Sequence, residues 1–379
     1  MEKKIIYMDN AATTKPFQEV IDEVNKCLTL DYYNPSSIHT PGLSIRNKVE
    51  KVRSIIADAI NAKPEEIYFT SGGTESDNWA LRGWLKPGSH LITTKIEHHA
   101  ILHTAEFLER NGVEVTYLDV DKNGYIDLHQ LEKEIKVNTT LLSIMFANNE
   151  IGTIQHIEEI GKIAAKYNIQ FHTDAVQAMC HVPIDVRKMN IDMLSASAHK
   201  FGGIKGSGFL YVKDGLISPF IMGGGQENEY RAGTENVPGI LAMGKAIEIS
   251  QKYDYENIRE IRDYMANEII SNINEASINN FLSGSLPNCL NVCFNGIPGE
   301  ALGGFLDIYN ICVSNGSACN SKYNKPSYVL KAIGLSDDEA NSSVRFSLGY
   351  DTTKKDVDYV VNCLEKAVKQ LKMAQEVKI

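Results

Sequence analysis

The sequence lacks long apolar runs, an excess of positive charge and a regular pattern of cysteines. No apolar stretch reaches the roughly 20 residues that a membrane-spanning helix needs, and the apolar core after Met1 is too short for a signal peptide. Lysine and arginine number 38 against 48 aspartate and glutamate residues, so the net charge is -10. Such an acidic chain is poorly suited to bind nucleic acids or anionic membranes. We therefore expect no direct nucleic-acid or membrane partner.

The seven cysteines are scattered between Cys27 and Cys363. An odd number without paired spacing argues against a disulfide framework and for a reducing compartment. Cys289, Cys293 and Cys312 raise the alternative of a zinc site, but the paired CxxC spacing of such sites is missing. We expect free thiols and a cytoplasmic location.

A length of 379 residues, 43% of them hydrophobic, is long for one hydrophobic core and favours two domains. We assign residues 16–250 to a large domain, and residues 1–15 and 251–379 to a small α+β domain. Apolar residues at helical spacing from about Ile240 through Ile270 indicate a helical connector. The strands expected in the small domain lie near Leu290–Phe294, Ile311–Ser314 and Val344–Leu348.

Short apolar runs alternate with helical patterns in the large domain. This alternation is typical of βαβ units, so we predict an α/β fold with a seven-stranded, mostly parallel sheet. Two helices are expected before the sheet, the first opened by Pro16. The expected strands are Ile67–Phe69, His90–Thr93, Val113–Leu118, Leu141–Phe146, Ile169–His172, Met193–Ser195 and Gly208–Val212. In such sheets, ligands bind at the carboxyl ends of the strands.

Small residues at 195–198 precede His199 and Lys200, and glycines follow at 202–203. Glycines let the backbone bend close to a bound molecule. A lysine walled in by small residues loses solvation, which makes available the neutral amine that Schiff-base chemistry requires. Ser197 and His199 supply donors for a phosphate. The alternative is an ordinary loop lysine beside a tight turn.

Two further polar motifs follow predicted strands. The glycines within Ser71–Ser76 expose backbone N–H groups at the start of a helix, which favours an anion. Asp174 follows another strand, where its carboxylate can pair with a protonated ring nitrogen. A plain helix cap is the alternative for each motif.

Glu97, His98 and His99 precede a predicted helix. A flat imidazole there can stack on an aromatic ligand or transfer protons. One alternative is a structural histidine. Another is a metal pair of His99 and His103 at i,i+4 spacing, for which the sequence offers no obvious third ligand. We expect no metal site.

An aspartate, a lysine and phosphate-binding loops at successive strand ends are what pyridoxal 5'-phosphate needs. With these residues the chain resembles the NifS/IscS-like cysteine desulfurases, within the class V aminotransferase group of fold-type I pyridoxal-phosphate enzymes. The resemblance extends from Asp9 to the last helix. Its motifs are TSGGTES (70–76), EHHA (97–100), NNEIG (148–152), HTDAVQ (172–177), SAHKFGG (197–203), RAGTEN (231–236), GSAC (316–319) and SSVRFSLG (342–349).

The resemblance implies a cofactor-binding role for a set of matching residues. Lys200 would form the Schiff base, Asp174 would pair with the ring nitrogen, and His98 would stack on the ring and act as an acid or base. Asn149 and Gln177 would contact the ring hydroxyl. The full set is Gly73, Thr74, His98, Asn149, Asp174, Gln177, Ser197, His199, Lys200 and Thr234, of which Gly73, Thr74, Ser197 and His199 would hold the phosphate.

The resemblance also implies a substrate site and a homodimer. Arg345 would bind the substrate carboxylate through a bidentate pair, assisted by Asn34. Thr234 would reach the phosphate in the neighbouring subunit, so each site would need two chains.

The polar segment from about 315 to 326 contains one cysteine, Cys319, and ends at Pro326. A loop of this kind can move and carry a nucleophile. By resemblance, Cys319 would take the sulfur of L-cysteine as a persulfide, leave L-alanine, and pass the sulfur to an acceptor protein. The acceptor would serve iron–sulfur cluster assembly or the thiolation of tRNA or cofactors. The alternatives are a selenocysteine lyase, another class V aminotransferase, and a non-enzymatic binding protein.

Overall fold

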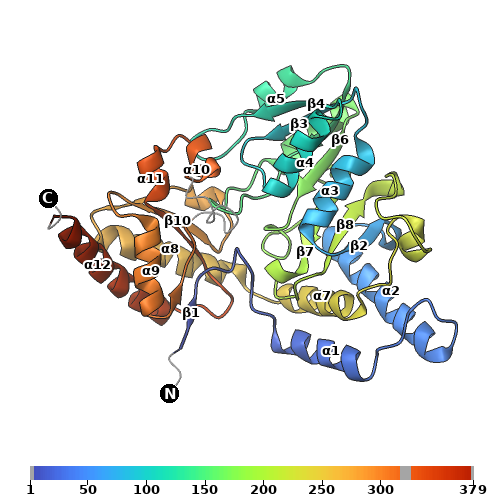
Figure 1. Ribbon diagram of the computed structural model, residues 1–379, viewed down its shortest axis with the longest axis horizontal. Coiled ribbons are helices and arrows are strands. Elements are labelled where there is room, and N and C mark those ends of the chain that lie inside the picture. Colours follow the sequence, from blue (N-terminus) through green and yellow to red (C-terminus); the bar gives the residue numbers. More distant parts are fainter. Residues whose placement is uncertain (1–3, 316–325, 377–379) are drawn as a thin grey trace.

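The computed structural model describes residues 4–315 and 326–376, and its central feature is a seven-stranded sheet (Figure 1). The strands lie in the order β2-β8-β7-β6-β5-β3-β4. Strand β8 is antiparallel to both of its neighbours, and the other neighbouring pairs are parallel. The predicted mostly parallel sheet is therefore confirmed. Its strands are β2 (Ile67–Thr70), β3 (His90–Thr94), β4 (Glu114–Leu118), β5 (Thr139–Ser143), β6 (Gln170–Asp174), β7 (Met193–Ser197) and β8 (Gly208–Val212).

Helices cover both faces of this sheet. One face packs on α2, α6 and α7, and the other packs on α3 and α4. The apolar spacing of α2 explains its place, because Ile45, Val49, Val52, Ile56 and Ile60 form one buried stripe. The helices of this part are α1 (Gln18–Thr29), α2 (Thr40–Ile60), α3 (Gly73–Trp84), α4 (His99–Glu109), α5 (Leu128–Glu134), α6 (Ile157–Tyr167) and α7 (Val237–Ser250).

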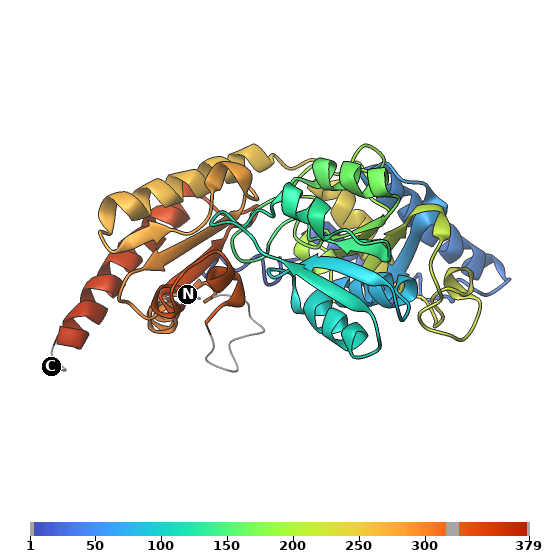
Figure 2. The same cartoon turned by 90° about the horizontal axis from the view of Figure 1, so that it is seen from above.

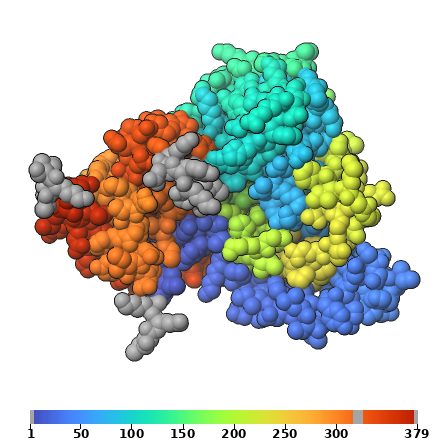
Figure 3. All heavy atoms as spheres, viewed as in Figure 1, coloured from blue at the N-terminus to red at the C-terminus, as the bar shows by residue number. Residues whose placement is uncertain are grey.

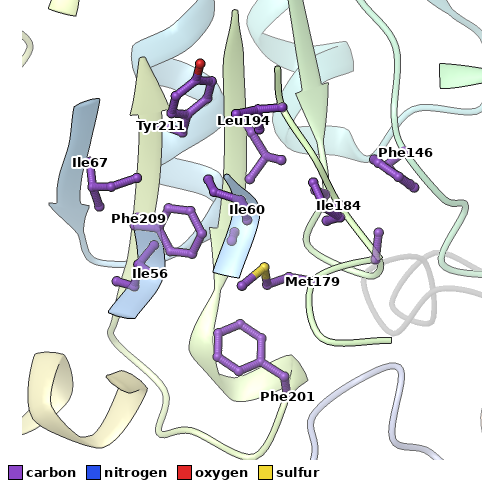
Figure 4. Close-up of a cluster of buried hydrophobic side chains, with 14 of the residues drawn as sticks. Ile56, Ile60, Ile67, Phe146, Met179, Ile184, Leu194, Phe201, Phe209 and Tyr211 are labelled. Atoms are coloured by element: carbon purple, nitrogen blue, oxygen red, sulfur yellow. The ribbon is translucent and has the colours of Figure 1, made fainter. Parts of the chain in front are cut away.

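Strand β8 shows how the sheet is buried on both faces. Phe209 and Tyr211 point into the cluster shared with α2, whereas Leu210 and Val212 join the cluster shared with α3 and α4. Figure 4 shows Phe209 near Ile56 and Ile60, and Tyr211 near Leu194, all of the first cluster. This period-two alternation buries both faces of the strand.

Two helix boundaries differ from the predictions. The first helix begins at Gln18 and not at Pro16, because Phe17 is its N-cap, with extended backbone, and its side chain is buried. The helical pattern from Ile240 to Ile270 is two helices, α7 and α8 (Tyr255–Asn272), separated by a turn. The side chain of Asp254 caps the second helix, a start signal that the apolar spacing alone did not reveal.

The C-terminal part has a second hydrophobic cluster around a three-stranded antiparallel sheet of order β12-β10-β9 (Figure 2). Ile6 and Met8 of the N-terminal segment join this cluster, and β1 (Ile6–Tyr7) pairs with β11 (Ile311–Cys312). The predicted strand near Ile311–Ser314 is thus short, although Ser314 also bridges to Arg345. The remaining elements are α8, β9 (Ala276–Ile278), β10 (Cys289–Phe294), α9 (Gly299–Ile308), α10 (Tyr328–Ala332), α11 (Asp337–Asn341), β12 (Ser343–Ser347) and α12 (Lys354–Glu376).

The predicted division into residues 16–250 on one side and 1–15 with 251–379 on the other stays a prediction. In the described part of the chain, no helix is both long enough and apolar enough to span a membrane.

Candidate active site

A cavity of about 450 Å³ opens where several strands of the large sheet end. Strand β2 leads into the loop of Gly72 and Gly73, β6 ends at Asp174, and β7 ends at Ser197. Because the carboxyl ends of parallel strands share one edge, these motifs meet although they are far apart in sequence. The predicted site residues that line the cavity are Gly73, Thr74, His98, Asn149, Asp174, Gln177, Ser197, His199, Lys200 and Arg345.

Lys200 lies directly after β7, in a short 3₁₀ turn formed by Ala198–Lys200. Its Nζ donates hydrogen bonds to the carbonyl oxygens of Ala11, at 2.7 Å, and Ala12, at 2.9 Å. The hydroxyl of Thr14 donates to the carbonyl of Lys200 at 3.0 Å. The N-terminal segment therefore fixes both the backbone and the amine of this lysine.

The two glycines after Lys200 serve a different purpose from the one predicted. Gly202 has φ +84°, and a Cβ there would lie 2.2 Å from the ring of Phe17. A Cβ at Gly203 would lie 2.7 Å from the Cβ of Ala198. Both glycines thus let the chain pack tightly on itself, and neither lines the cavity. The expectation that they approach a bound molecule was wrong.

Asp174 is buried at the end of β6, where its Oδ1 accepts a hydrogen bond from the N–H of Val176 at 2.9 Å. Residues 176–181 form turns, so the alternative that Asp174 caps a following helix is excluded. Burial raises the pKa of Asp174 to about 6, against the opposing effects of this hydrogen bond and of the charge of Lys200.

The burial of two carboxyl groups near Asp174 was not predicted from the sequence. Asp77, on α3, also lines the cavity, and its Oδ1 has no hydrogen-bond partner. Burial, followed by the negative charge of Asp174, raises the pKa of Asp77 well above its usual range. Burial likewise raises the pKa of Glu97 to about 8. Asp77 directly follows the motif TSGGTES, and Glu97 is the first residue of EHHA. The sequence does not reveal that either side chain is buried.

The ring of His98 faces the cavity at the start of α4. Its Nδ1 accepts a hydrogen bond from the N–H of Ala100 at 3.2 Å, which leaves the proton of a neutral ring on Nε2. Burial, then the charges of Lys200 and His103, lower the pKa of His98 to about 4. His98 is therefore a neutral imidazole at physiological pH.

The metal alternatives gain no support from the described residues. The rings of His99 and His103 lie 4.8 Å apart, but no third potential ligand joins them in the described part of the chain. Likewise, Cys289, Cys293 and Cys312 are free thiols that form no such group there.

The loop before α3 is suited to an anion. Gly72, with φ +145°, is the N-cap of this helix and contributes no side-chain cap, so backbone N–H groups are left for a ligand. A Cβ on Gly73 would lie 2.5 Å from Val176, which makes glycine necessary there. Nearby, Nδ1 of His199 lies 3.2 Å from the hydroxyl of Thr13. Burial, then Lys200 and Lys205, lower the pKa of His199 to about 4.

Arg345 brings the only guanidinium among the described residues that line the cavity, and it is 2% exposed. It donates to the carbonyl of Asn149 at 2.7 Å and to Oδ1 of Asp9 at 2.8 Å. Its Nε and the Oδ1 of Asn149 are buried without a hydrogen-bond partner. Such atoms in a cavity favour a polar ligand. Gln177, also at the cavity, donates to the carbonyl of Ala11 at 3.0 Å.

Two of the predicted site residues that the structure describes do not line the cavity. Oδ1 of Asn34 accepts from the N–H of Ser36 at 2.8 Å, and Asn34 does not line the cavity. Thr234 is exposed and does not line it either. Cys319 lies outside the described residues. The roles of all three stay predictions.

The comparisons with known proteins decide the family. The model of "Aminotransferase class-V" matches residues 6–360. The chain belongs to this family. It is 47% identical over 378 residues to "Cysteine desulfurase IscS" of Dictyoglomus turgidum, covering 98% of this chain and 96% of that protein. It is 48% identical over 377 residues to a protein of the same name from Clostridium botulinum, covering 97% and 95%.

Solved structures agree with this assignment. A "NifS-like protein" has a TM-score of 0.91 at 37% identity, over 97% of this chain and 100% of that one. A structure described as "SspA in complex with cysteine" has a TM-score of 0.82 at 40% identity, over 90% of this chain and 98% of that one. The predicted resemblance to NifS/IscS-like cysteine desulfurases is confirmed. Membership of this family implies an enzyme that uses pyridoxal phosphate.

Gly202→Ala should destabilise the protein through both backbone strain and the clash with Phe17. We expect a loss of about 2–5 kcal/mol in the free energy of unfolding, measured in urea. Gly206→Ala is the matched control, because Gly206 also has a positive φ, +80°, but nothing lies within 4 Å of its Cβ position. Equal losses in the two variants would show that Phe17 does not impose the glycine.

The raised pKa of Asp174 predicts a pH-dependent stability. Because the folded cofactor-free protein binds this proton more tightly than the unfolded chain, its free energy of unfolding falls as the pH rises from about 4 through about 6. Asp174→Asn should therefore stabilise the cofactor-free protein by about 3 kcal/mol at pH 8 and by much less at pH 4. The exposed Asp58→Asn is the charge-matched control. A stability difference independent of pH would contradict the assignment.

Proposed function

We propose that this protein is a cysteine desulfurase that converts L-cysteine to L-alanine and retains the sulfur as a persulfide on Cys319. The observation that carries the proposal is that one cavity holds Lys200, Asp174 and Arg345 in a chain 47% identical to a protein named for this activity. Such a reaction requires three groups: an amine base, a carboxylate that pairs with a cationic ring, and a cation that binds the substrate carboxylate.

The cavity fits pyridoxal phosphate as its cofactor. Lys200 would bond to it, Asp174 would pair with its ring nitrogen, and the open N-terminus of α3 would hold its phosphate with Ser197. The unpartnered Oδ1 of Asn149 suits a hydroxyl donor. When bound, the cofactor supplies an electron sink for the bond electrons at the substrate α-carbon.

The residues of the chain divide the acid–base work. Lys200, as a neutral amine, would take the α-proton, and the carbonyls of Ala11 and Ala12 would hold the ammonium that forms. His98, a neutral imidazole with its proton on Nε2, would supply a second proton donor beside the ring. Arg345 would bind the substrate carboxylate, with Asp9 and the Asn149 carbonyl holding the guanidinium in place.

The sulfur step would belong to Cys319. Its thiolate would attack the substrate sulfur, so that a sulfur–sulfur bond forms while the carbon–sulfur bond breaks. The bond electrons stay with the carbon, which takes up a proton and becomes the methyl group of alanine. One L-cysteine and one thiol thus give one L-alanine and one persulfide.

We propose that the persulfide sulfur passes to an acceptor protein in the cytoplasm. The free thiols of the described cysteines are compatible with such a reducing compartment. The acceptor would serve iron–sulfur assembly or thiolation of tRNA or cofactors.

Cys319→Ser is the test of the proposed function. The variant should keep the yellow colour of the bound cofactor and still change its spectrum on adding cysteine, because Lys200 and Asp174 remain. It should release almost no alanine and carry no persulfide, since a serine hydroxyl is a poor nucleophile at neutral pH. Cys312→Ser is the control and should cost only packing. A persulfide found by mass spectrometry on another cysteine, with Cys319 unmodified, would contradict the proposal.

The predicted homodimer, with Thr234 acting on the neighbouring subunit, is also a proposal. Lys200→Ala and Thr234→Ala chains should each have little activity alone. When the two are co-expressed, each mixed dimer has one site with both residues intact, so about a quarter of the wild-type activity should return. Mixed dimers without regained activity would show that Thr234 serves its own subunit.

A further inference from the structure

Helix α10 begins two residues after the described chain resumes, and its N-cap contacts the large sheet's loops. The hydroxyl of Ser327 accepts from the N–H of Leu330 at 3.2 Å and donates to Oε2 of Glu150 at 2.5 Å. Glu150 is fully buried, and Ser327 is 7% exposed. A buried hydrogen bond from a hydroxyl to a carboxylate is stronger than one between neutral groups. It joins α10 to the motif NNEIG.

Other contacts hold α10 in the same place. The hydroxyl of Tyr328 donates to the carbonyl of Glu97 at 2.6 Å, and its ring meets the edge of His99 at 4.9 Å between centroids. Figures 1 and 3 show this orange-red segment lying against the green and teal loops of the large sheet. An apolar cluster lies beneath it, formed by Ile96, Met145, Ile151, Val329, Leu330, Ile333 and Ala340.

Glu150 itself sits in a rigid turn. Oδ1 of Asn148 accepts from the N–H groups of Glu150 and Ile151, at 2.8 and 3.0 Å. Gly152, with φ +72°, closes the turn by donating its N–H to the carbonyl of Asn148 at 2.9 Å. The carbonyl of Glu150 accepts from the side chain of Asn291 on β10 at 3.0 Å. The carboxylate therefore has little freedom to follow α10 if the helix moves.

The span of chain between Ser314 and Ser327 carries Cys319. Its N-terminal end, at Ser314, is also fixed beside the cavity. Ser314 exchanges two backbone hydrogen bonds with Arg345, at 2.7 and 3.2 Å. We propose that Glu150 and Ser327 act as a positioning pair: they fix the C-terminal end of the span that carries Cys319, as Arg345 fixes its N-terminal end. The inference rests on the proposed function of Cys319, and neither member of the pair contacts the reacting atoms.

Loss of the pair should loosen only the first turn of α10, because Tyr328 and the apolar cluster still hold the rest of the helix. The span that carries Cys319 then loses its nearest C-terminal anchor. The rate of sulfur transfer should fall, whereas chemistry at the substrate α-carbon should not change.

The test measures two rates in the complete, cofactor-loaded enzyme. One is persulfide formation on Cys319 in a single turnover with L-cysteine, followed by mass spectrometry. The other is exchange of the α-proton of L-alanine in D₂O, which needs Lys200 but no thiol. Ser327→Ala and Glu150→Gln should each slow the first and leave the second unchanged. The double variant should be no slower than either single variant, because the same bond is lost.

Hydrogen exchange of the peptide containing α10 reports on the anchor itself. Both single variants should exchange faster there than the wild type. Ser336→Ala is the matched control, because Ser336 caps the equally short α11 through the N–H of Glu339 at 3.2 Å without contacting the large sheet. It should speed exchange in α11 only and leave both rates unchanged.

Each other outcome has a definite meaning. Faster exchange in α10 with normal persulfide formation would overturn the positioning role, as would equal losses in both rates. Unchanged exchange in α10 would overturn the anchor. A wild-type enzyme that exchanges the α-proton of alanine but forms no persulfide on Cys319 would refute the proposed function. The amide hydrogen exchange of α10 would still test the anchor in that case.

Discussion

The amine of Lys200, which follows a strand of the large sheet, donates hydrogen bonds to the carbonyls of Ala11 and Ala12 in the N-terminal segment. The arrangement of the site depends on these contacts. The same N-terminal segment is fixed to the small sheet, because the N–H of Ala11 donates to the hydroxyl of Ser347 at 2.8 Å. Asp9 adds the ion pair with Arg345. One short stretch of backbone therefore contacts both the lysine, which follows β7 of the large sheet, and the arginine, which lies on β12 of the small sheet. A shift of one sheet against the other would change both contacts together.

The burial of acids around one lysine shapes the electrostatics of the cavity. Asp77, Glu97 and Asp174 are all buried, and burial raises the pKa of each. His172, buried behind them with Nε2 at 3.7 Å from Asp77, has its pKa lowered to about 3 by burial and supplies no compensating charge. A hydrogen bond and the charge of Lys200 oppose the burial of Asp174, and its pKa of about 6 lies below the pKa of about 8 of Glu97. A cationic ring would complete this charge balance.

The sequence predicted the sheet well because most of its strands are buried on both faces and contain a short apolar run, as β8 does with Phe209 to Val212. Through the family resemblance it also supplied ten residues that line one cavity, and the shared edge of the strand ends brings most of them together. It failed where the cause is tertiary. The glycine at 202 is required by Phe17, which lies far away in the chain, and the burial of Asp77 depends on the packing of α3 against β6 and β7. No local pattern encodes either contact.

Consecutive residues of one turn connect the carbon and sulfur halves of the proposed reaction. The carbonyl of Asn149 holds Arg345, the proposed receptor of the substrate carboxylate, and the carboxylate of Glu150 holds Ser327. Because Asn148 fixes the turn through its own side chain, these two anchors cannot move independently. The separation of Arg345 and Ser327 thus depends on these two hydrogen bonds and on the backbone of the NNEIG turn. A rigid link of this kind lets a nucleophile on a separate segment meet a bound substrate without a contact between the two sites.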